Sequence, residues 1–548
     1  MEVWSVGREA AGAASGPGAR TLHEVAARLA TQPSAAWEWI ERRQESHAAE
    51  ERRSAGRQRG AVATPASVAE AMACRLLEGW PRGSRVRVLD AGCGSGRLLT
   101  AAVRCGAARG LRLSCEGMEI DAAAARWARA LEPVVRAGAG EALVAWRVRC
   151  ADFLFTKVTG PGFDAAIANP PYVSLRRLEP AYRDKLRARL GPLAQGDLAA
   201  LFVSRMLRHL RPGGRLCVIV PNKLLAAGYA APLRRELLET TCVEEIWDLS
   251  EGGVFDGCGA YPVVVVASRR AAGRRHRIVI RAASGAVRAR WPLPALRGLP
   301  EQLLPLGLPP AAMPLALRLL AGTRLEDVAS VGCGIATSGF GKAIGAGDER
   351  ILCSGDVRAF GLGAARRFAP ERAGIAPATL ARQRVAKVVV PGMFRRLRAA
   401  YDGDGHVLGR VYFIPVEGAS AASRAHRRAL LLALLNSRLY AVLYNALFAG
   451  VSQAGGYVRL NAPYLRCMPW PGRETHPDLV RLVRAMERGA ADGTRERLEA
   501  VVESLFDLEP GERRLLARLE RDLIPAGSSP GRLGSARYGS LHGDVPGA

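Results

Sequence analysis

Lysine, paired cysteines and long uninterrupted apolar runs are all scarce in this chain of 548 residues. The eleven cysteines are scattered, with no C-x-x-C pair and no histidine at ligand spacing beside them. Zinc sites and disulfide frameworks are recognised by such spacings, so the sequence predicts neither. We therefore expect reduced thiols and no metal ion.

The apolar residues do not form a membrane-spanning pattern. The N-terminus lacks the apolar core of a signal peptide. The longest apolar stretch, residues 429–451, is interrupted by Asn436, Arg438 and Asn445. Such a stretch is typical of a buried amphipathic helix rather than a membrane span. The sequence thus predicts no membrane partner, and reduced thiols are typical of a cytoplasmic location.

Positive charge is in excess and comes almost entirely from arginine. Lys and Arg together number 78 against 51 Asp and Glu, which gives a net charge of +27. Part of this excess follows the general Ala, Gly and Arg bias of the composition. Clustered arginines neutralise phosphates and release counterions, so the charge favours a polyanionic partner. A solvated basic surface without a ligand is the alternative.

The tetrapeptide Asn169-Pro170-Pro171-Tyr172 follows the apolar run 163–168, which reads as a buried strand. Neither proline donates an N–H, so the strand ladder stops and the chain stays extended with its carbonyls turned outward. The Asn169 side-chain oxygen and such a carbonyl could accept both hydrogens of an amino group on a planar base, while Tyr172 stacks on its ring. A simple proline-rich turn after a strand is the structural alternative.

Acidic, glycine and aromatic residues follow other predicted strands. The strand 85–89 runs into Asp90-Ala91-Gly92-Cys93-Gly94-Ser95-Gly96, the strand 111–118 ends at Glu119, and the strand 145–149 leads to Asp152-Phe153. Glycines at a helix start allow a ligand to approach the backbone, although such a turn also occurs for structural reasons alone. Glu119 lies at the spacing of a ribose-binding acid. Asp121 is interpreted as a helix cap. The alternation of strands and helices predicts a doubly wound α/β sheet.

The rest of the chain changes character after about residue 269. A helix over 197–210 and strands over 215–220, 246–249 and 261–267 complete the expected sheet, with a loop over 251–259. Residues 269–314 are rich in Arg, Pro and Gly and indicate a domain boundary. A helix is predicted over 427–447. One set of basic residues is a candidate phosphate-contacting face, or only a solvated one: Arg382, Arg384, Lys387, Arg395, Arg396 and Arg398.

The order of these motifs resembles the gamma-class DNA adenine amino-methyltransferases, specifically the TaqI-type family with a C-terminal specificity domain. The resemblance covers roughly residues 61–471 and is strongest over 64–266. It includes Thr64-Pro65 before the glycine loop, the Asn-Pro-Pro-Tyr motif, and three later segments. Those segments are Leu435-Asn436-Ser437, Gly455-Gly456-Tyr457 and Met468-Pro469-Trp470-Pro471.

The resemblance implies a role for individual residues. Asn169, Pro170 and Tyr172 would be catalytic, and Tyr172 and Phe255 would stack on the target base. The cofactor would be S-adenosyl-L-methionine. The residues implied in binding it are Thr64, Asp90, Gly92, Gly94, Glu119, Asp152, Phe153, Pro171 and Phe202. Two features depart from the family pattern. Extra glycines surround Phe255, and Cys93 occupies a position whose residue varies in the family.

The resemblance also implies a domain order. We expect an α/β protein with a Rossmann-like doubly wound methyltransferase domain, a mixed α/β target-recognition domain and a C-terminal helical segment. The predicted boundaries are a helical basic leader (1–60), the methyltransferase domain (61–270), a linker (271–324), the target-recognition domain (325–475), C-terminal helices (476–525) and a disordered tail (526–548).

The implied function is site-specific methylation of a flipped adenine in double-stranded DNA, within a restriction-modification or related defence system. Double-stranded DNA would be the partner, with association to the nucleoid and a separate restriction endonuclease as a candidate partner. The alternatives are an amino-methyltransferase acting on RNA or protein glutamine, and a non-catalytic DNA-binding specificity protein. The leader is too short for a fused nuclease domain, so no cleavage is expected.

Overall fold

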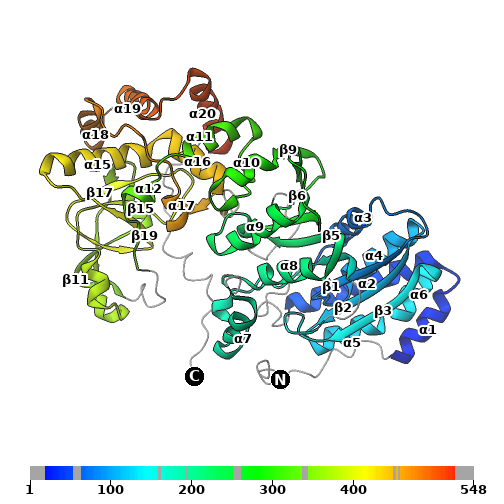
Figure 1. Cartoon of the computed structure of the whole chain (residues 1–548). Coiled ribbons are helices and arrows are strands. Elements are labelled where there is room, and N and C mark those ends of the chain that lie inside the picture. Colours follow the sequence, from blue (N-terminus) through cyan, green and yellow to red (C-terminus); the bar gives the residue numbers. More distant parts are fainter. Residues whose placement is uncertain are drawn as a thin grey trace. The chain divides into compact units, whose positions relative to one another are not determined.

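The structure is a computed structural model that describes residues 19–53, 63–157, 162–191, 195–250, 261–335, 343–448, 452–453, 457–490 and 492–524. The chain divides into two compact units, Met1–Leu304 and Pro305–Ala548. Figure 1 shows the helices and strands of each unit. The predicted loop with Phe255 and the predicted tail both lie outside the described residues.

A large sheet forms the centre of the first unit. Within the described residues it has nine strands in the order β3-β2-β1-β4-β5-β7-β6-β8-β9. Strands β1 to β5 run parallel, and β7 is inserted antiparallel between β5 and β6. The strands are β1 (Arg85–Ala91), β2 (Arg112–Glu119), β3 (Leu143–Cys150), β4 (Phe163–Ala168), β5 (Leu210–Pro221), β6 (Cys242–Asp248), β7 (Pro262–Ser268), β8 (Arg277–Ala282) and β9 (Val287–Pro292).

Both faces of this sheet are covered, as expected for a parallel sheet whose crossover connections are helices. Val88 and Ile167 face a core shared with α3 and α4, whereas Leu89 and Ala166 point to the opposite face and are equally buried. The helices are α1 (Ala19–Leu29), α2 (Pro33–Arg53), α3 (Ala66–Leu76), α4 (Arg97–Ala108), α5 (Ala122–Ala130), α6 (Glu132–Ala139), α7 (Pro180–Leu190), α8 (Leu198–His209), α9 (Ala231–Thr240) and α10 (Leu293–Gly298). The predicted doubly wound α/β fold is confirmed.

The predicted linker over 271–324 is wrong for its first part. Residues 277–298 form β8, β9 and α10, and β8 pairs with β6 at the end of the same sheet. Ile278, Ile280 and Trp291 are buried, while the arginines between them are more exposed. Burial of every second residue is typical of a strand. The many arginines in this segment made the alternation of apolar and polar residues hard to recognise in the sequence.

The described part of the leader, residues 19–53, forms two helices that pack against the rest of the first unit. Leu22 of α1 and Ile40 of α2 are buried in the core that also contains residues of α3 to α6. A Cβ atom at Gly138 of α6 would come within 2.8 Å of the Trp37 ring. The close approach of α2 to α6 therefore depends on a residue without a side chain.

The second unit contains several small sheets. Within the described residues their orders are β10-β19-β15-β17, β14-β11-β18, β12-β13 and β16-β21-β20. The strands are β10 (Gly332–Cys333), β11 (Ile344–Cys353), β12 (Val357–Arg358), β13 (Gly361–Leu362), β14 (Arg366–Phe368), β15 (Lys387–Pro391), β16 (Met393–Phe394), β17 (Ala400–Asp402), β18 (Val407–Gly409), β19 (Val411–Pro415), β20 (Ser452–Gln453) and β21 (Tyr457–Arg459). The helices are α11 (Met313–Leu320), α12 (Leu325–Val328), α14 (Pro377–Ala381), α15 (Ala421–Asn436), α16 (Arg438–Phe448), α17 (Ala462–Arg466), α18 (Leu479–Glu487), α19 (Asp492–Leu505) and α20 (Pro510–Leu523).

The helix predicted over 427–447 is instead two helices, α15 and α16, which meet at Ser437. The Asn436 amide donates to the Ala399 and Leu432 carbonyls, and the Ser437 hydroxyl accepts from the Tyr440 backbone N–H. These side-chain bonds replace helical backbone bonds and stabilise the break. Across the described residues, no single helix is long and apolar enough to cross a membrane. The bent pair α15 and α16 meets that requirement only when counted together, on length and composition alone.

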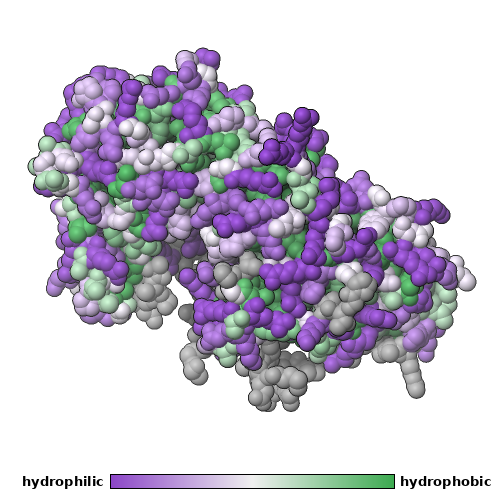
Figure 2. Space-filling view, in the orientation of Figure 1, coloured by the Kyte–Doolittle hydropathy of each residue, from purple (hydrophilic) through white to green (hydrophobic). Residues whose placement is uncertain are grey.

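Hydrophilic residues cover most of the surface of each unit that Figure 2 displays, with hydrophobic ones scattered between them. Many of the arginines form ion pairs within their own unit, such as Arg211 with Asp164 and Arg318 with Glu512. Part of the excess positive charge is thus compensated locally.

Candidate functional site

The chain reverses its direction of travel across the sheet between β1 and β4. From β1 it proceeds through β2 and β3 towards one edge, and it returns to the other side of β1 to form β4 and β5. Ligands bind outside the carboxyl ends of parallel strands at such a switch point. Asp90 at the end of β1 lies in register with Gly117 of β2 and Ile167 of β4. Asp90, Glu119, Asp152 and Asn169, which end or follow β1, β2, β3 and β4, therefore lie at one edge of the sheet.

The glycine loop between β1 and α4 is held by β2. The backbone N–H groups of Gly92 and Cys93 both donate to the Met118 carbonyl, at 2.8 and 3.0 Å. Gly92, Gly94 and Gly96 have positive φ angles of 88°, 52° and 83°. Other residues adopt this region only with strain. A Cβ atom at Gly94 would meet nothing within 4 Å, so the space above the loop is open.

Glu119 is oriented by the same loop. Its Oε2 accepts the Gly94 N–H at 2.9 Å, and its Oε1 accepts the Asp121 N–H at 2.8 Å. Burial raises the pKa of Glu119, and these backbone hydrogen bonds oppose the shift. A carboxylate oxygen can accept further hydrogen bonds, and the partly exposed Glu119 is thus suited to bind hydroxyl groups. Asp121 caps α5 through Ala123 and Ala124, as predicted.

Asp90 is fully buried, and in the described part of the chain neither of its carboxylate oxygens has a hydrogen-bond partner. Burial and the nearby charge of Glu119 raise the pKa of Asp90 well above its usual range. A buried carboxylate without a partner is costly unless it is protonated or paired. The position therefore suits a ligand that brings a positively charged group to the end of β1.

A second part of the predicted cofactor site lies after β3. Asp152 accepts the Leu154 N–H at 2.9 Å and the Tyr182 hydroxyl at 2.7 Å. The Phe153 ring lies 5.3 Å from that of Phe202 on α8, and a Cβ atom at Gly92 would be 3.6 Å from the same Phe202 ring. The fold thus brings together Gly92, Phe153 and Phe202, which are far apart in the sequence.

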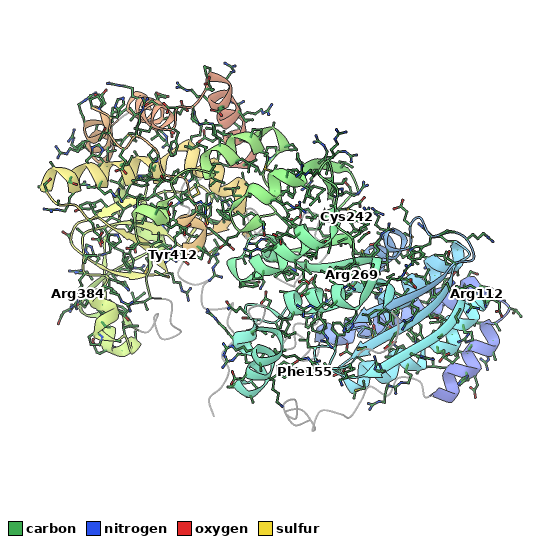
Figure 3. The ribbon with its side chains drawn as sticks, viewed as in Figure 1. Arg112, Phe155, Cys242, Arg269, Arg384 and Tyr412 are labelled. Atoms are coloured by element: carbon green, nitrogen blue, oxygen red, sulfur yellow. The ribbon has the colours of Figure 1, made fainter. Side chains whose placement is uncertain are left out.

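Two supporting residues were not predicted from the sequence. Tyr182 of α7 binds Asp152, and its ring also contacts Phe155, which Figure 3 labels. Arg205 of α8 donates to the Phe153 and Thr156 carbonyls, both at 2.7 Å. Neither residue lies in a recognisable motif, so only the packing of α7 and α8 reveals these contacts.

The Asn-Pro-Pro-Tyr motif follows β4 directly, as predicted. The Asn169 Nδ2 donates to the Thr64 hydroxyl at 3.2 Å. Pro170 is buried, and Asn169, Pro171 and Tyr172 are half-buried. Tyr172 packs against the core of the first unit. The contact with Asn169 gives Thr64, predicted as a cofactor residue, a role in orienting the motif.

The chain after Tyr172 is fixed to the start of α8. Leu198 donates its N–H to the Val173 carbonyl, and Leu175 donates to the Gly196 carbonyl, at 2.9 and 2.7 Å. The buried Asp197 carboxylate binds Lys223 Nζ at 2.7 Å and the Tyr229 hydroxyl at 2.6 Å. This anchor was not predicted from the sequence.

The second unit corrects the candidate phosphate-contacting face. Lys387 is fully buried and forms an ion pair with Asp402 at 2.7 Å. The prediction that Lys387 contacts phosphate is therefore wrong. Arg396 pairs with Glu520, and Arg398 donates to the Val357 carbonyl. Arg384 remains half-exposed beside Glu349 (Figure 3). The described residues contain no group of three or more His, Cys, Asp or Glu side chains that could hold a metal ion.

Comparison with known proteins identifies a related family for part of the chain. Residues 136–255 match the family described as Eco57I restriction-modification methylase. The curated type II methyltransferase M.BanIII of Aneurinibacillus aneurinilyticus is 29% identical over 213 residues, which is 36% of each chain. The chain thus spans about a third of the length of this relative.

Solved structures show more distant similarity. The type IIG restriction endonuclease BpuSI is 14% identical, with a TM-score of 0.37 over 86% of this chain and 67% of its own. A type I restriction-modification methyltransferase subunit from Streptococcus thermophilus is 21% identical, with a TM-score of 0.34 over 41% and 47%. A candidate class I S-adenosylmethionine-dependent methyltransferase from Listeria monocytogenes is 16% identical, with a TM-score of 0.34 over 40% and 65%.

Proposed function

We propose that this protein is a DNA methyltransferase of a restriction-modification system, which transfers a methyl group to the exocyclic amino group of a flipped adenine. The observation that carries the proposal is the position of Asn169-Pro170 at the end of β4, which pairs with β1, the strand that leads into the glycine loop. The family match over residues 136–255 includes this motif and supports methylase activity.

The cofactor is S-adenosyl-L-methionine, which supplies a methyl group already activated on a positively charged sulfur. The residues present fit such a molecule. Glu119 is positioned to bind ribose hydroxyls, and Phe153 and Phe202 offer an apolar wall for the adenine. The buried Asp90 carboxylate suits a cationic group near the end of β1.

The protein's own task is to position the target amino group. The Asn169 Oδ1 and the Pro170 carbonyl accept its two hydrogens and turn the nitrogen lone pair out of conjugation with the ring. Thr64 holds the Asn169 amide in the required orientation. Positioning of this kind supplies much of a transfer reaction's acceleration. No covalent nucleophile on the protein is needed.

A duplex hides the adenine amino group, so the base must be extruded, at a cost of a few kcal/mol. Tyr172 would stack on one face of the base and Phe255 on the other. We assign recognition of the DNA sequence to residues 325–475 of the second unit, with the C-terminal helices 476–525 as their support. A protein that methylates chromosomal DNA would work in the bacterial cytoplasm, with a restriction endonuclease as its partner.

A single experiment tests this function. The full-length protein is incubated with labelled S-adenosylmethionine and unmethylated genomic DNA, and modified positions are read by single-molecule sequencing. We expect N6-methyladenine at one short sequence. Label transferred only to RNA or to a protein glutamine would contradict the proposal, and a protein without cofactor affinity in calorimetry would be a non-catalytic binder.

The Asn169→Ala variant tests the site itself. Removal of one of two acceptors should lower kcat by about 100-fold or more, because an acceptor aimed at the transition state is worth roughly 3 kcal/mol. Cofactor affinity should stay close to that of the unchanged protein. Unaltered turnover in the labelled-cofactor assay would rule out this role for Asn169.

A further inference from the structure

Cys74 on α3 and Cys105 on α4 bring their sulfur atoms within 3.0 Å of each other. A disulfide bond has a length of about 2.05 Å, so an approach of roughly 1 Å would join the two sulfurs. The two cysteines are 31 residues apart, and neither lies in a spacing pattern that a sequence search recognises. Their proximity is a consequence of the packing of α3 against α4.

We propose that Cys74 and Cys105 form a reversible intramolecular disulfide, which is a redox modification site of this protein. The inference does not depend on the methyltransferase reaction. The oxidant is a low-molecular-weight disulfide such as oxidised glutathione, and the reductant that reverses the bond is a dithiol.

The exposure of the two thiols sets the order of the reaction. Cys74 is exposed, whereas Cys105 is only 8% exposed. The Cys74 thiolate attacks one sulfur of oxidised glutathione and releases the first glutathione thiolate. The Cys105 thiolate then attacks the Cys74 sulfur and releases the second. Two protein thiols are oxidised, and one small disulfide is reduced to two thiols.

The second step is the slower one. Burial, followed by the contact with Cys74, raises the pKa of the Cys105 thiol to about 12, and nearby Arg109 opposes this shift. Little Cys105 thiolate is therefore present at neutral pH. The short distance between the sulfurs compensates, because the attack is intramolecular.

The positions of the two helices give the bond its significance. Helix α4 begins directly after the glycine loop, at Arg97. Helix α3 begins two residues after Thr64, whose hydroxyl accepts from Asn169. A bond between α3 and α4 would tie together the two helices that lead from these parts of the site.

The test uses the full-length protein treated with oxidised glutathione, after which accessible thiols are alkylated in denaturant. The chain has eleven cysteines, so formation of one bond leaves nine to be alkylated. Peptide mapping should find Cys74 linked to Cys105, and dithiothreitol should restore eleven alkylated residues. Alkylation of all eleven after oxidation would overturn the proposal.

Two variants sharpen this test. Cys105→Ala should retain glutathione on Cys74, because the resolving thiol is absent, while Cys333→Ser, at an exposed cysteine of the second unit, should leave the cross-link intact. A stable glutathione adduct on Cys74 of the unchanged protein would also overturn the proposal. Oxidation should raise the unfolding midpoint of the first unit by about 5 °C, and this rise should be lost in Cys74→Ser.

Discussion

At the scale of single residues, the site depends on contacts that hold polar groups ready for a ligand. Thr64 and Asn169 are 105 positions apart in the sequence, yet their side chains form a hydrogen bond. Glu119 joins the glycine loop to the start of α5 through two backbone N–H groups. Each contact fixes the direction of a side chain whose remaining acceptor sites can serve a ligand. The effect of small substitutions should therefore be larger on activity than on folding.

Thr64→Val and Thr64→Ser form a matched pair. Valine keeps the shape of threonine but cannot accept the hydrogen bond from Asn169, whereas serine retains the hydroxyl. We expect kcat to fall about fivefold in Thr64→Val, since one hydrogen bond contributes roughly 1 kcal/mol, and to stay near its original value in Thr64→Ser. Initial rates at saturating DNA and cofactor measure this. Equal losses in the two variants would show that the hydroxyl is not the important group.

The Asp90→Asn variant should be more stable than the unsubstituted protein at high pH but should bind the cofactor less tightly. The pKa of Asp90 is raised by burial and by the charge of Glu119, so the folded protein favours the protonated acid. The unsubstituted protein should therefore lose stability as the pH rises through this raised pKa, and Asp90→Asn should not. At high pH the variant should be more stable by roughly 1–3 kcal/mol.

The measurement for Asp90→Asn is a series of denaturation curves without cofactor over pH 5 to 9, with calorimetry for cofactor affinity. The stability advantage should be smallest at pH 5 and grow as the pH rises towards the raised pKa of Asp90, because the unfolded chain already ionises this carboxyl group near its ordinary pKa. Cofactor affinity should fall in the same variant. An advantage independent of pH would contradict the assignment to this carboxyl group.

At the scale of elements, the loop between β1 and α4 combines a backbone requirement with an open surface. Gly94 has a φ of 52°, and nothing lies within 4 Å of a Cβ atom built on it. Gly285, in the turn between β8 and β9, has a φ of 84° and equally open surroundings. The two glycines thus share a backbone constraint but differ in their distance from the site along the sheet.

Gly94→Ala and Gly285→Ala should each lower the free energy of unfolding by about 1–2 kcal/mol, because a left-handed alanine is strained. Only Gly94→Ala should also weaken cofactor binding, because its methyl group enters the space above the loop. We expect the affinity to fall tenfold or more, which corresponds to a loss of about 1.4 kcal/mol or more. Denaturant titration and calorimetry on both variants provide the comparison. A similar loss of affinity in Gly285→Ala would indicate an indirect effect of destabilisation.

At the scale of the whole molecule, ion pairs connect distant parts of the second unit. Glu520 of α20 binds Arg396, which follows β16, and Arg438 at the start of α16. Arg438 also lies near Glu503 of α19. Burial alone would raise the pKa of Glu520, but the hydrogen bonds from Arg396 and Arg438 bring it below its usual value. The C-terminal helices are thus fixed to the rest of their unit by charge.

Glu520→Gln should destabilise the second unit by about 1–3 kcal/mol at neutral pH, because hydrogen bonds to a charged carboxylate are lost. The lowered pKa means that Glu520 stabilises the fold above its unfolded pKa, and that this contribution is lost as the pH falls through the folded pKa. Hydrogen exchange of α20 at pH 7 and pH 4 measures the effect. The exposed pair Glu326 and Arg324 offers a control, and Glu326→Gln should change stability by less than about 0.5 kcal/mol.

The sequence alone determined the doubly wound sheet and the strand ends on which the site is built. Glycine, proline and acidic residues act through local backbone stereochemistry, and parallel strands bring their carboxyl ends to one edge, so Asp90, Glu119 and Asn169 could be placed from their neighbours. The tertiary structure alone decided the burial of Lys387, the break at Ser437, the strands β8 and β9, and the contacts of Thr64 with Asn169 and of Cys74 with Cys105. These features depend on which distant segments pack together, and a local pattern carries no information about the partner on the other side of a contact.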